Sequence, residues 1–212
     1  MEHNREKIVE RSWELFRKFG IKSVSMDDIA REMGMSKKTL YQVVKDKNDL
    51  VAGSVELVKS WVNSFWEVFH NDSYNAIEQH CHQREAVKGL YKHFNATFSF
   101  DLHKYFPEFY RELNEWRKKV ILEAHTANIE KGKREGLYRE DVNAEVIAKL
   151  LVAHHVYTFD PANEIFETSE IMDFSVVEQF YQYHLRGLCS EKGLKELKRL
   201  FANDKKSDNV QV

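Results

Sequence analysis

The amino-acid sequence predicts an all-α protein. The 212 residues include only two prolines, Pro107 and Pro161, and eight glycines. Glu, Lys, Leu and Ala are abundant, and no segment alternates apolar and polar residues as a strand does. With 42% hydrophobic and 31% charged residues, a chain of this length can bury the core of one large or two small domains.

The first helix is expected over residues 5–19. Apolar residues recur there at helical spacing, and Gly20 follows as a C-terminal cap. The apolar positions are Ile8, Leu15, Phe16 and Phe19.

Two short helical patterns then follow, joined by a break that contains Gly34. Ser25 with Asp28 three residues later is a capping-box signature, so a helix should begin near residue 26. Gly34 can adopt the positive φ of a tight turn, and Ser36 can accept the first free amides of the next helix. This layout is typical of a helix-turn-helix that reads DNA.

The helix that starts near Lys37 has two different faces. At about 100° per residue, Leu40, Val43 and Val44 fall on one side. The opposite side has two cations, a phenol and an amide without a carboxylate, which suits phosphate oxygens and base edges. Its residues are Lys38, Tyr41, Gln42 and Lys45. The alternative is an ordinary helical hairpin with a solvated basic face.

This segment resembles the N-terminal domain of TetR-type (TetR/AcrR) transcriptional regulators. The resemblance covers about fifty residues and includes residues 39–41, Lys45, and Lys47 leading into Asp49 and Leu50. Residues 8–19 with Gly20 match the family's first helix and its glycine stop. The chain departs from the family at residues 42–44, where aromatic or histidine residues are usual, so the operator sequence stays open.

The resemblance and the helix faces together predict the DNA-binding residues. Tyr41, Lys45 and Lys47 are expected on backbone phosphates, whereas Lys37, Lys38, Thr39 and Gln42 lie nearest the bases. Ser25 and Ser36, which begin the two helices, complete the predicted set.

Further helices are expected along the rest of the chain. Asp46 and Asp49 repeat the capping signature before a long helix over residues 50–69, which would join two domains as a rigid strut. Helical patterns continue over residues 74–98, followed by a short segment near residues 101–106. Pro107 suits the first turn of a helix that reaches about residue 131, where Gly132 and Gly136 would end it.

Two late helices have apolar stripes wider than one buried face needs. A turn at residues 136–143 resembles the one before the penultimate helix in TetR-type proteins, where two such helices pair with their copies in a homodimer. The predicted interface contains Ile147, Leu151, His154, Val177, Phe180, Tyr181, His184 and Leu188. The alternative is burial within the protomer. Residues 160–173 between the helices are expected to be an irregular acidic loop.

The resemblance also implies a small-molecule effector among the C-terminal helices. Aromatic side chains with histidine anchors could line its pocket. The candidates are Phe65, Phe94, Phe98, Trp116, His125 and His154. No cofactor or metal is predicted, because the adjacent residues His80, Cys81 and His82 diverge by about 100° each on a helix.

Charge and cysteine content constrain the function less. The net charge is −2, with +2 in residues 1–53 and −4 in the remainder, so the first segment is slightly basic. Cys81 and Cys189 are distant in sequence and no segment is long and apolar enough to cross a membrane, which together predict a reducing cytoplasm.

The sequence therefore predicts a homodimeric, ligand-responsive regulator of palindromic operator DNA, most simply a repressor and not an enzyme. Residues 1–48 would form the helix-turn-helix domain, residues 49–202 the effector and dimer domain, and residues 203–212 a disordered tail. Two alternatives remain: a helical protein-binding adaptor, and a di-iron enzyme. The enzyme would need two Glu-x-x-His pairs, of which the chain has one, at Glu67 and His70.

Overall fold

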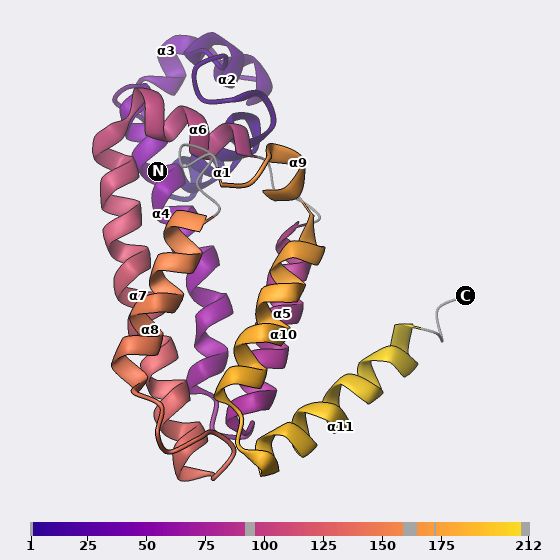
Figure 1. Cartoon of the computed structure of the whole chain (residues 1–212). Helices are drawn as coiled ribbons and strands as arrows, with labels where there is room; N and C mark the ends of the chain where they lie inside the picture. Colours follow the sequence, from indigo (N-terminus) through magenta and orange to yellow (C-terminus); the bar gives the residue numbers. More distant parts are fainter. Residues whose placement is uncertain (1, 92–95, 159–164, 172, 209–212) are drawn as a thin grey trace. The chain divides into compact units, whose positions relative to one another are not determined.

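The computed structural model describes residues 2–91, 96–158, 165–171 and 173–208. These residues form helices and contain no β-strand (Figure 1). The elements are α1 (Glu2–Phe19), α2 (Met26–Glu32), α3 (Lys37–Leu40), α4 (Lys47–Trp66), the 3-10 helix η1 (Glu67–His70), α5 (Ala76–Tyr91), α6 (Ala96–Tyr105), α7 (Pro107–Arg134), α8 (Ala144–Ala153), the π-helix η2 (His154–Thr158), α9 (Thr168–Ile171), α10 (Phe174–Leu188) and α11 (Glu191–Asp208).

The chain divides into two compact units. The first contains residues 1–62 and 95–116, and the second contains residues 63–94 and 117–212. The predicted boundary after residue 48 differs from this division, because α4 and α7 each run without a break from one unit into the other. Helical continuity removes the linker by which a sequence reveals a domain boundary.

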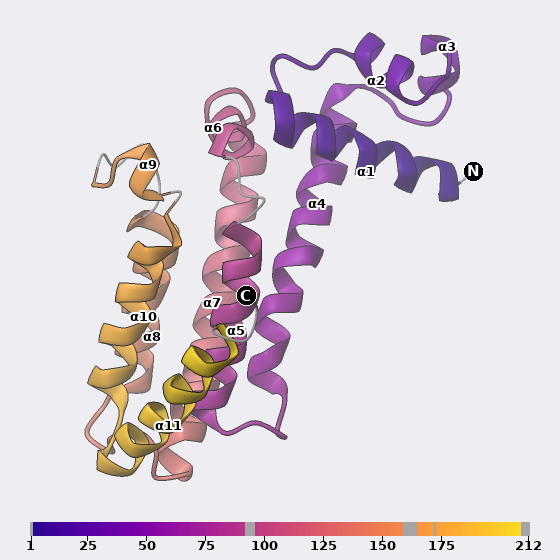
Figure 2. The same cartoon turned by 90° about the vertical axis from the view of Figure 1, so that its right-hand side faces the viewer.

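The first unit surrounds a core supplied by the first four helices. Ile8 and Phe16 of α1, Ile29 of α2, Leu40 of α3 and Leu50 of α4 are fully buried in it. Figure 2 shows α1, α2 and α3 grouped beside the beginning of α4. The apolar spacing read from the sequence thus produces the predicted packing, and the two short helices are held as a unit.

A buried carboxylate of α6 fixes the turn after α1. Gly20 adopts a φ of +86°, which favours glycine. A Cβ at this position would lie 2.7 Å from the Asp101 Oδ2 atom, so a side chain would have to displace this carboxylate. The same oxygen accepts a hydrogen bond of 2.9 Å from the Lys22 amide. Residues about eighty positions apart therefore shape the entrance to the helix-turn-helix.

The second unit packs α5 against α10 and α11. Its core includes Ile77, Ile129, Tyr138 and Leu185. The sequence suggested that Gly132 ends α7, but the helix continues past it to Arg134. A glycine is needed at residue 132 because the ring of Tyr138 occupies the space of a side chain. Gly136, with a φ of +67°, follows the helix and allows the chain to reverse.

Three other expectations need correction. The fourth helix ends at Trp66 and continues as η1. Within the acidic segment 160–173, residues 168–171 form α9, while residues 160–164 lie outside the described part. α11 continues to Asp208, so residues 203–208 are helical although they carry little apolar surface.

No helix in the described part of the chain combines the length and the apolar character that a bilayer crossing requires.

Candidate nucleic-acid interface

The predicted capping box at the start of α2 is confirmed. The Ser25 hydroxyl accepts a hydrogen bond of 3.2 Å from the Asp28 amide, and the Ser25 amide donates at 2.9 Å to the Asp28 Oδ2 atom. Hydrogen bonding from Ser25 lowers the pKa of the Asp28 carboxyl, so the ionised form is the one that caps. The Ser25 hydroxyl is therefore engaged as the N-cap of α2, where it accepts from the Asp28 amide.

α3 is shorter than the two-faced pattern suggested. Ser36 caps it by accepting a hydrogen bond of 3.0 Å from the Thr39 amide. The α-helix ends at Leu40, and hydrogen bonds from Gln42 to Thr39 and from Val43 to Leu40 continue the chain as tighter turns. The three-residue spacing of these turns keeps the polar side chains close together.

The two faces of this segment lie as predicted. Leu40 is 0% and Val44 is 2% exposed, whereas Tyr41 is 45% exposed. Lys38, Gln42 and Lys45 are also exposed. A set of two cations, one phenol and one amide therefore faces solvent beside a tightly packed apolar anchor, and such a set can bind phosphates and base edges.

Two predicted cations have protein partners. The Lys37 ammonium forms an ion pair of 3.0 Å with Asp27, which raises the pKa of Lys37. The Lys47 ammonium donates at 3.4 Å to the Lys22 carbonyl oxygen. Burial lowers the pKa of Lys47, while Asp101 and Asp28 oppose this shift. Lys47 therefore has to give up its present hydrogen bond before it can contact a phosphate.

Replacing Ser25 with alanine tests the capping box. We expect Ser25→Ala to lower the free energy of unfolding by about 1 kcal/mol, because the Asp28 amide loses its acceptor. Urea unfolding followed by circular dichroism measures the change. Ser60→Ala is the matched control, since Ser60 is exposed within α4, and it should leave the value unchanged or raise it slightly. Equal losses in both variants would contradict a capping role.

The predicted effector residues are divided between the two units. Phe98 is buried in the core of the first unit and Trp116 packs against that core. Phe65, His125 and His154 belong to the second unit, and Phe94 lies outside the described residues. The assignment of these residues to an effector pocket stays a prediction. Aromatic residues at helical spacing supply both cores, and the spacing does not tell which core each residue enters.

The predicted dimer residues also separate into two groups. Leu151, Val177, Tyr181 and Leu188 are buried within the protomer, so these four are corrected to core residues. Ile147, His154, Phe180 and His184 are partly exposed. One edge of each wide apolar stripe therefore packs into the protomer core, and the other edge faces solvent. The most exposed apolar residues of these helices are Val146, Leu150, Tyr157 and Tyr183.

Sequence reasoning missed a cluster of histidines in the second unit. His80, dismissed as a metal ligand, is fully buried, and its ring lies 5.5 Å from that of His125. His155 lies 5.5 Å from His125 on the other side. The available signal was a histidine within the apolar stripe of each helix. Within the described part, no group of three or more His, Cys, Asp or Glu side chains is arranged to hold a metal ion.

Comparisons with known proteins agree with this arrangement. Residues 8–53 match the family model described as bacterial regulatory proteins, tetR family. An HTH-type transcriptional regulator of Staphylococcus aureus (strain bovine RF122 / ET3-1) is 33% identical over 73 residues, which are 32% of this chain and 40% of that protein. The alignment thus spans less than half of that relative.

Solved structures resemble the fold over nearly the whole chain. A transcriptional regulator of the TetR/AcrR family from Thermobifida fusca has a TM-score of 0.60 at 22% identity, covering 87% of this chain and 98% of that one. A putative transcriptional regulator from Saccharomonospora viridis, in complex with choline, has a TM-score of 0.69 at 16% identity, covering 90% and 100%.

The family model matches the helix-turn-helix residues, and the helices that follow have the fold of solved regulators. Residues 8–53 thus match the tetR family of bacterial regulatory proteins, and the relatives that share this segment are HTH-type transcriptional regulators.

Proposed function

We propose that this regulator is a homodimeric, cytoplasmic repressor that binds a palindromic DNA operator and releases it when a small effector binds. The observation that carries the proposal is the exposed polar set on and after α3, which contains Lys38, Tyr41, Gln42 and Lys45. These four residues lie on the face opposite the buried side chains of Leu40 and Val44, in the segment that matches the family model.

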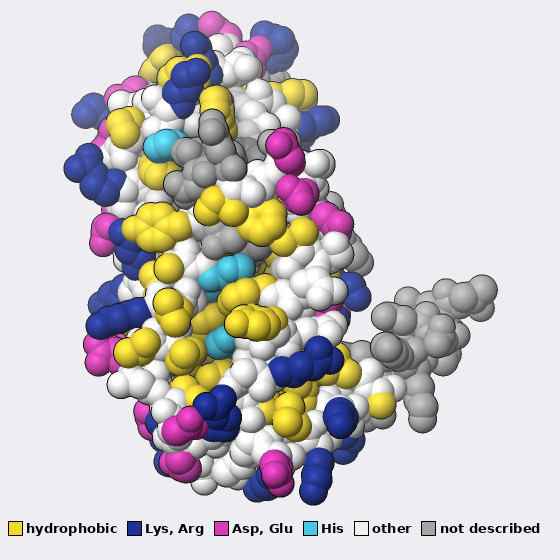
Figure 3. Space-filling view, in the orientation of Figure 1, with side chains coloured by type: hydrophobic (Ala, Val, Ile, Leu, Met, Phe, Trp, Pro, Cys, Tyr) yellow, Lys and Arg dark blue, Asp and Glu magenta, His cyan; other side chains and the backbone are white. Residues whose placement is uncertain are grey.

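An apolar surface on the second unit supports the homodimer. Figure 3 shows hydrophobic side chains gathered over α8 and α10, with histidines between them. Leu150 is 61% and Tyr183 is 79% exposed. Exposed apolar side chains concentrated on two helices are typical of a surface that a partner covers. A two-fold dimer can place its reading segments about one DNA turn apart, which is roughly 34 Å.

The effector is expected in the second unit. The choline complex of the Saccharomonospora protein shows that a chain of this fold can hold a small molecule. To act as an inducer, an effector must bind better to the conformation that does not fit the operator. The described residues do not identify that effector.

Gln42→Ala and Lys45→Ala should affect DNA binding differently. Gln42 can donate to and accept from one base edge, so its loss should change preference at one base pair by about 1–3 kcal/mol. Lys45 should contact phosphate, and its loss should weaken binding to every duplex and lower the salt slope by about one unit. Fluorescence anisotropy at several salt concentrations measures both effects. Identical effects on cognate and random DNA would contradict the assigned roles.

Selection of duplexes from a random pool tests the proposal as a whole. The purified protein should enrich a palindrome whose half-sites are about one helical turn apart. No enrichment, or enrichment of single half-sites, would contradict operator binding by a dimer. A protein-binding adaptor would enrich nothing.

A further inference from the structure

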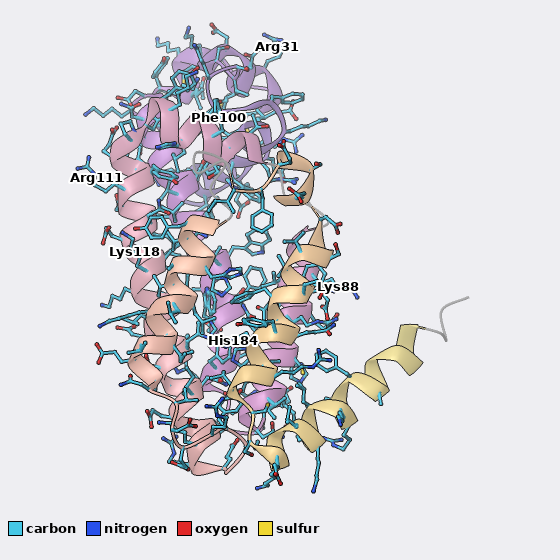
Figure 4. All side chains as sticks on the ribbon, viewed as in Figure 1. Arg31, Lys88, Phe100, Arg111, Lys118 and His184 are labelled. Atoms are coloured by element: carbon cyan, nitrogen blue, oxygen red, sulfur yellow. The ribbon has the colours of Figure 1, made fainter. Side chains whose placement is uncertain are left out.

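Each of five histidines in the second unit has its ring within 5.8 Å of the ring of at least one other histidine. They come from four different elements, which are α5 (His80), α7 (His125), η2 (His154 and His155) and α10 (His184). The ring centroids of His80 and His184 are 5.8 Å apart, and those of His154 and His155 are 5.4 Å apart. His184, labelled in Figure 4, extends from α10 into this cluster.

The inner histidines are almost completely removed from water. His80 is 0% and His125 is 1% exposed. Neither ring nitrogen of either residue has a hydrogen-bond partner in the described part of the chain. Aromatic rings surround them instead, with Phe69 5.0 Å from His80 and Trp66 5.4 Å from His125. An imidazolium at these positions would have no water to stabilise its charge, and the Asn128 side chain, which favours the charged form of His80, does not offset the effect of burial.

The charged groups near the cluster do not stabilise the protonated form of its histidines. On α7, Arg117 donates at 3.1 Å to the His155 carbonyl oxygen, which brings a positive charge to the cluster. On α5 and α10, Arg84 pairs with Glu178, so this carboxylate is already engaged. Tyr181 of α10 donates its hydroxyl to Gln83 of α5. Among the described groups that shift these imidazoles, none is a carboxylate.

Burial lowers the pKa of every histidine in the cluster. For His80, burial acts first, repulsion by His184 second, and the Asn128 side chain opposes both. Burial and then repulsion from other histidines likewise lower the pKa values of His125 and His155 far below 6.5. Those of His154 and His184 fall to about 4. All five imidazoles are therefore neutral in the folded protein at pH 7.

We propose that this histidine cluster is a proton-operated switch, in which protons taken up below about pH 6.5 loosen the packing of α5, α7, η2 and α10. The unfolded chain takes up a proton at each histidine near pH 6.5, whereas the folded cluster does so only at lower pH. Folding is therefore independent of these groups above pH 6.5 and becomes less favourable as the pH falls. Each fully shifted imidazole lowers the folding equilibrium constant about tenfold per pH unit.

The arrangement of the rings favours protons over a metal ion. The ring planes of His80 and His125 meet at 22°, and those of His125 and His155 meet at 10°. Other pairs cross more steeply, such as His80 and His184 at 62°, but within the described part of the chain no group of three or more potential ligands is arranged to hold a metal ion. The proposal concerns the second unit alone and does not depend on DNA binding.

Urea unfolding of the full chain at pH 7.5, 6.5 and 5.5 tests the switch. Between pH 7.5 and 5.5 the folding equilibrium constant should fall about a thousandfold or more, which corresponds to three fully shifted imidazoles. Paired carboxylates contribute little here, because they titrate near pH 4. A fall of less than tenfold would overturn the proposal.

His125→Phe should reduce that fall by about tenfold, since one buried imidazole is replaced by a ring that stays neutral. His70→Phe is the matched control, because His70 is exposed in the same unit, and it should retain the full fall. Equal falls in both variants would overturn the proposal.

NMR titration of the unmodified protein tests the proposal if His125→Phe does not fold. The buried rings should stay neutral at pH 5.5, and titration of all ten histidines near pH 6.5 would refute the switch. Zinc at pH 7.5 should leave the urea unfolding midpoint unchanged. A raised midpoint would show that the cluster is a metal site, which would overturn the proposal.

Discussion

Gly132→Ala is expected to destabilise the second unit by about 4 kcal/mol, through overpacking and the loss of a buried hydrogen bond. A Cβ at residue 132 would lie 2.0 Å from the Cδ2 atom of Tyr138. The Tyr138 ring cannot move away without cost, because its hydroxyl lies 3.2 Å from two acceptors, Ala76 O and Asn128 Oδ1. The residue is 1% exposed, so a displaced hydroxyl would not reach water.

Thermal unfolding measures this effect, and a chain of this size should lose about 10 °C in Tm. Gly89→Ala is the matched control. Gly89 also lies within a helix, but no atom is within 4 Å of the position of its Cβ. This second variant should gain up to about 1 kcal/mol from helix propensity. A Gly132→Ala protein as stable as the unmodified chain would show that Tyr138 can be displaced at little cost.

Leu150→Glu is expected to weaken self-association at least about a hundredfold while leaving the protomer folded. Leu150 is 61% exposed on α8, so a carboxylate there remains hydrated in the free protomer. In the proposed homodimer the same carboxylate would be removed from water against an apolar partner surface, which is unfavourable. Analytical ultracentrifugation measures the association constant, and circular dichroism checks the fold.

Phe100→Glu provides the comparison for this interface. Phe100, labelled in Figure 4, is 51% exposed on α6 of the first unit. Its replacement should leave self-association unchanged. Loss of operator binding should accompany the loss of the dimer in Leu150→Glu, because a single protomer reaches only one half-site. A fully dimeric Leu150→Glu protein would move the interface away from α8.

Local chemistry explains which parts of the fold could be predicted from the sequence. The caps at Ser25 and Ser36 and the glycine turn at Gly34 depend on residues within a few positions of one another. The burial of Leu40 and Val44 follows from helical spacing alone. These short-range features are the ones that place the candidate DNA-binding side chains on one exposed surface.

Long-range packing explains the rest. The residues around Gly132 do not indicate that the Tyr138 ring packs against it. The residues around Gly20 likewise do not indicate that the Asp101 carboxylate lies beside it. Helical spacing marks the aromatic residues as apolar but does not show which of the two cores each residue enters; Phe98 is buried in the core of the first unit and Trp116 packs against it. The histidines were read one helix at a time, whereas their common burial depends on four elements meeting.

The tie between Gly20 and Asp101 has a consequence for protein engineering. The compact body that carries the helix-turn-helix is encoded by two separate stretches, residues 1–62 and 95–116. A chimaera that transplants only the first stretch onto another regulator would leave the Lys22 amide without its carboxylate acceptor. Exchanging DNA specificity between such proteins therefore calls for grafting both stretches, or for a host whose own α6 equivalent supplies an acidic residue at the matching position.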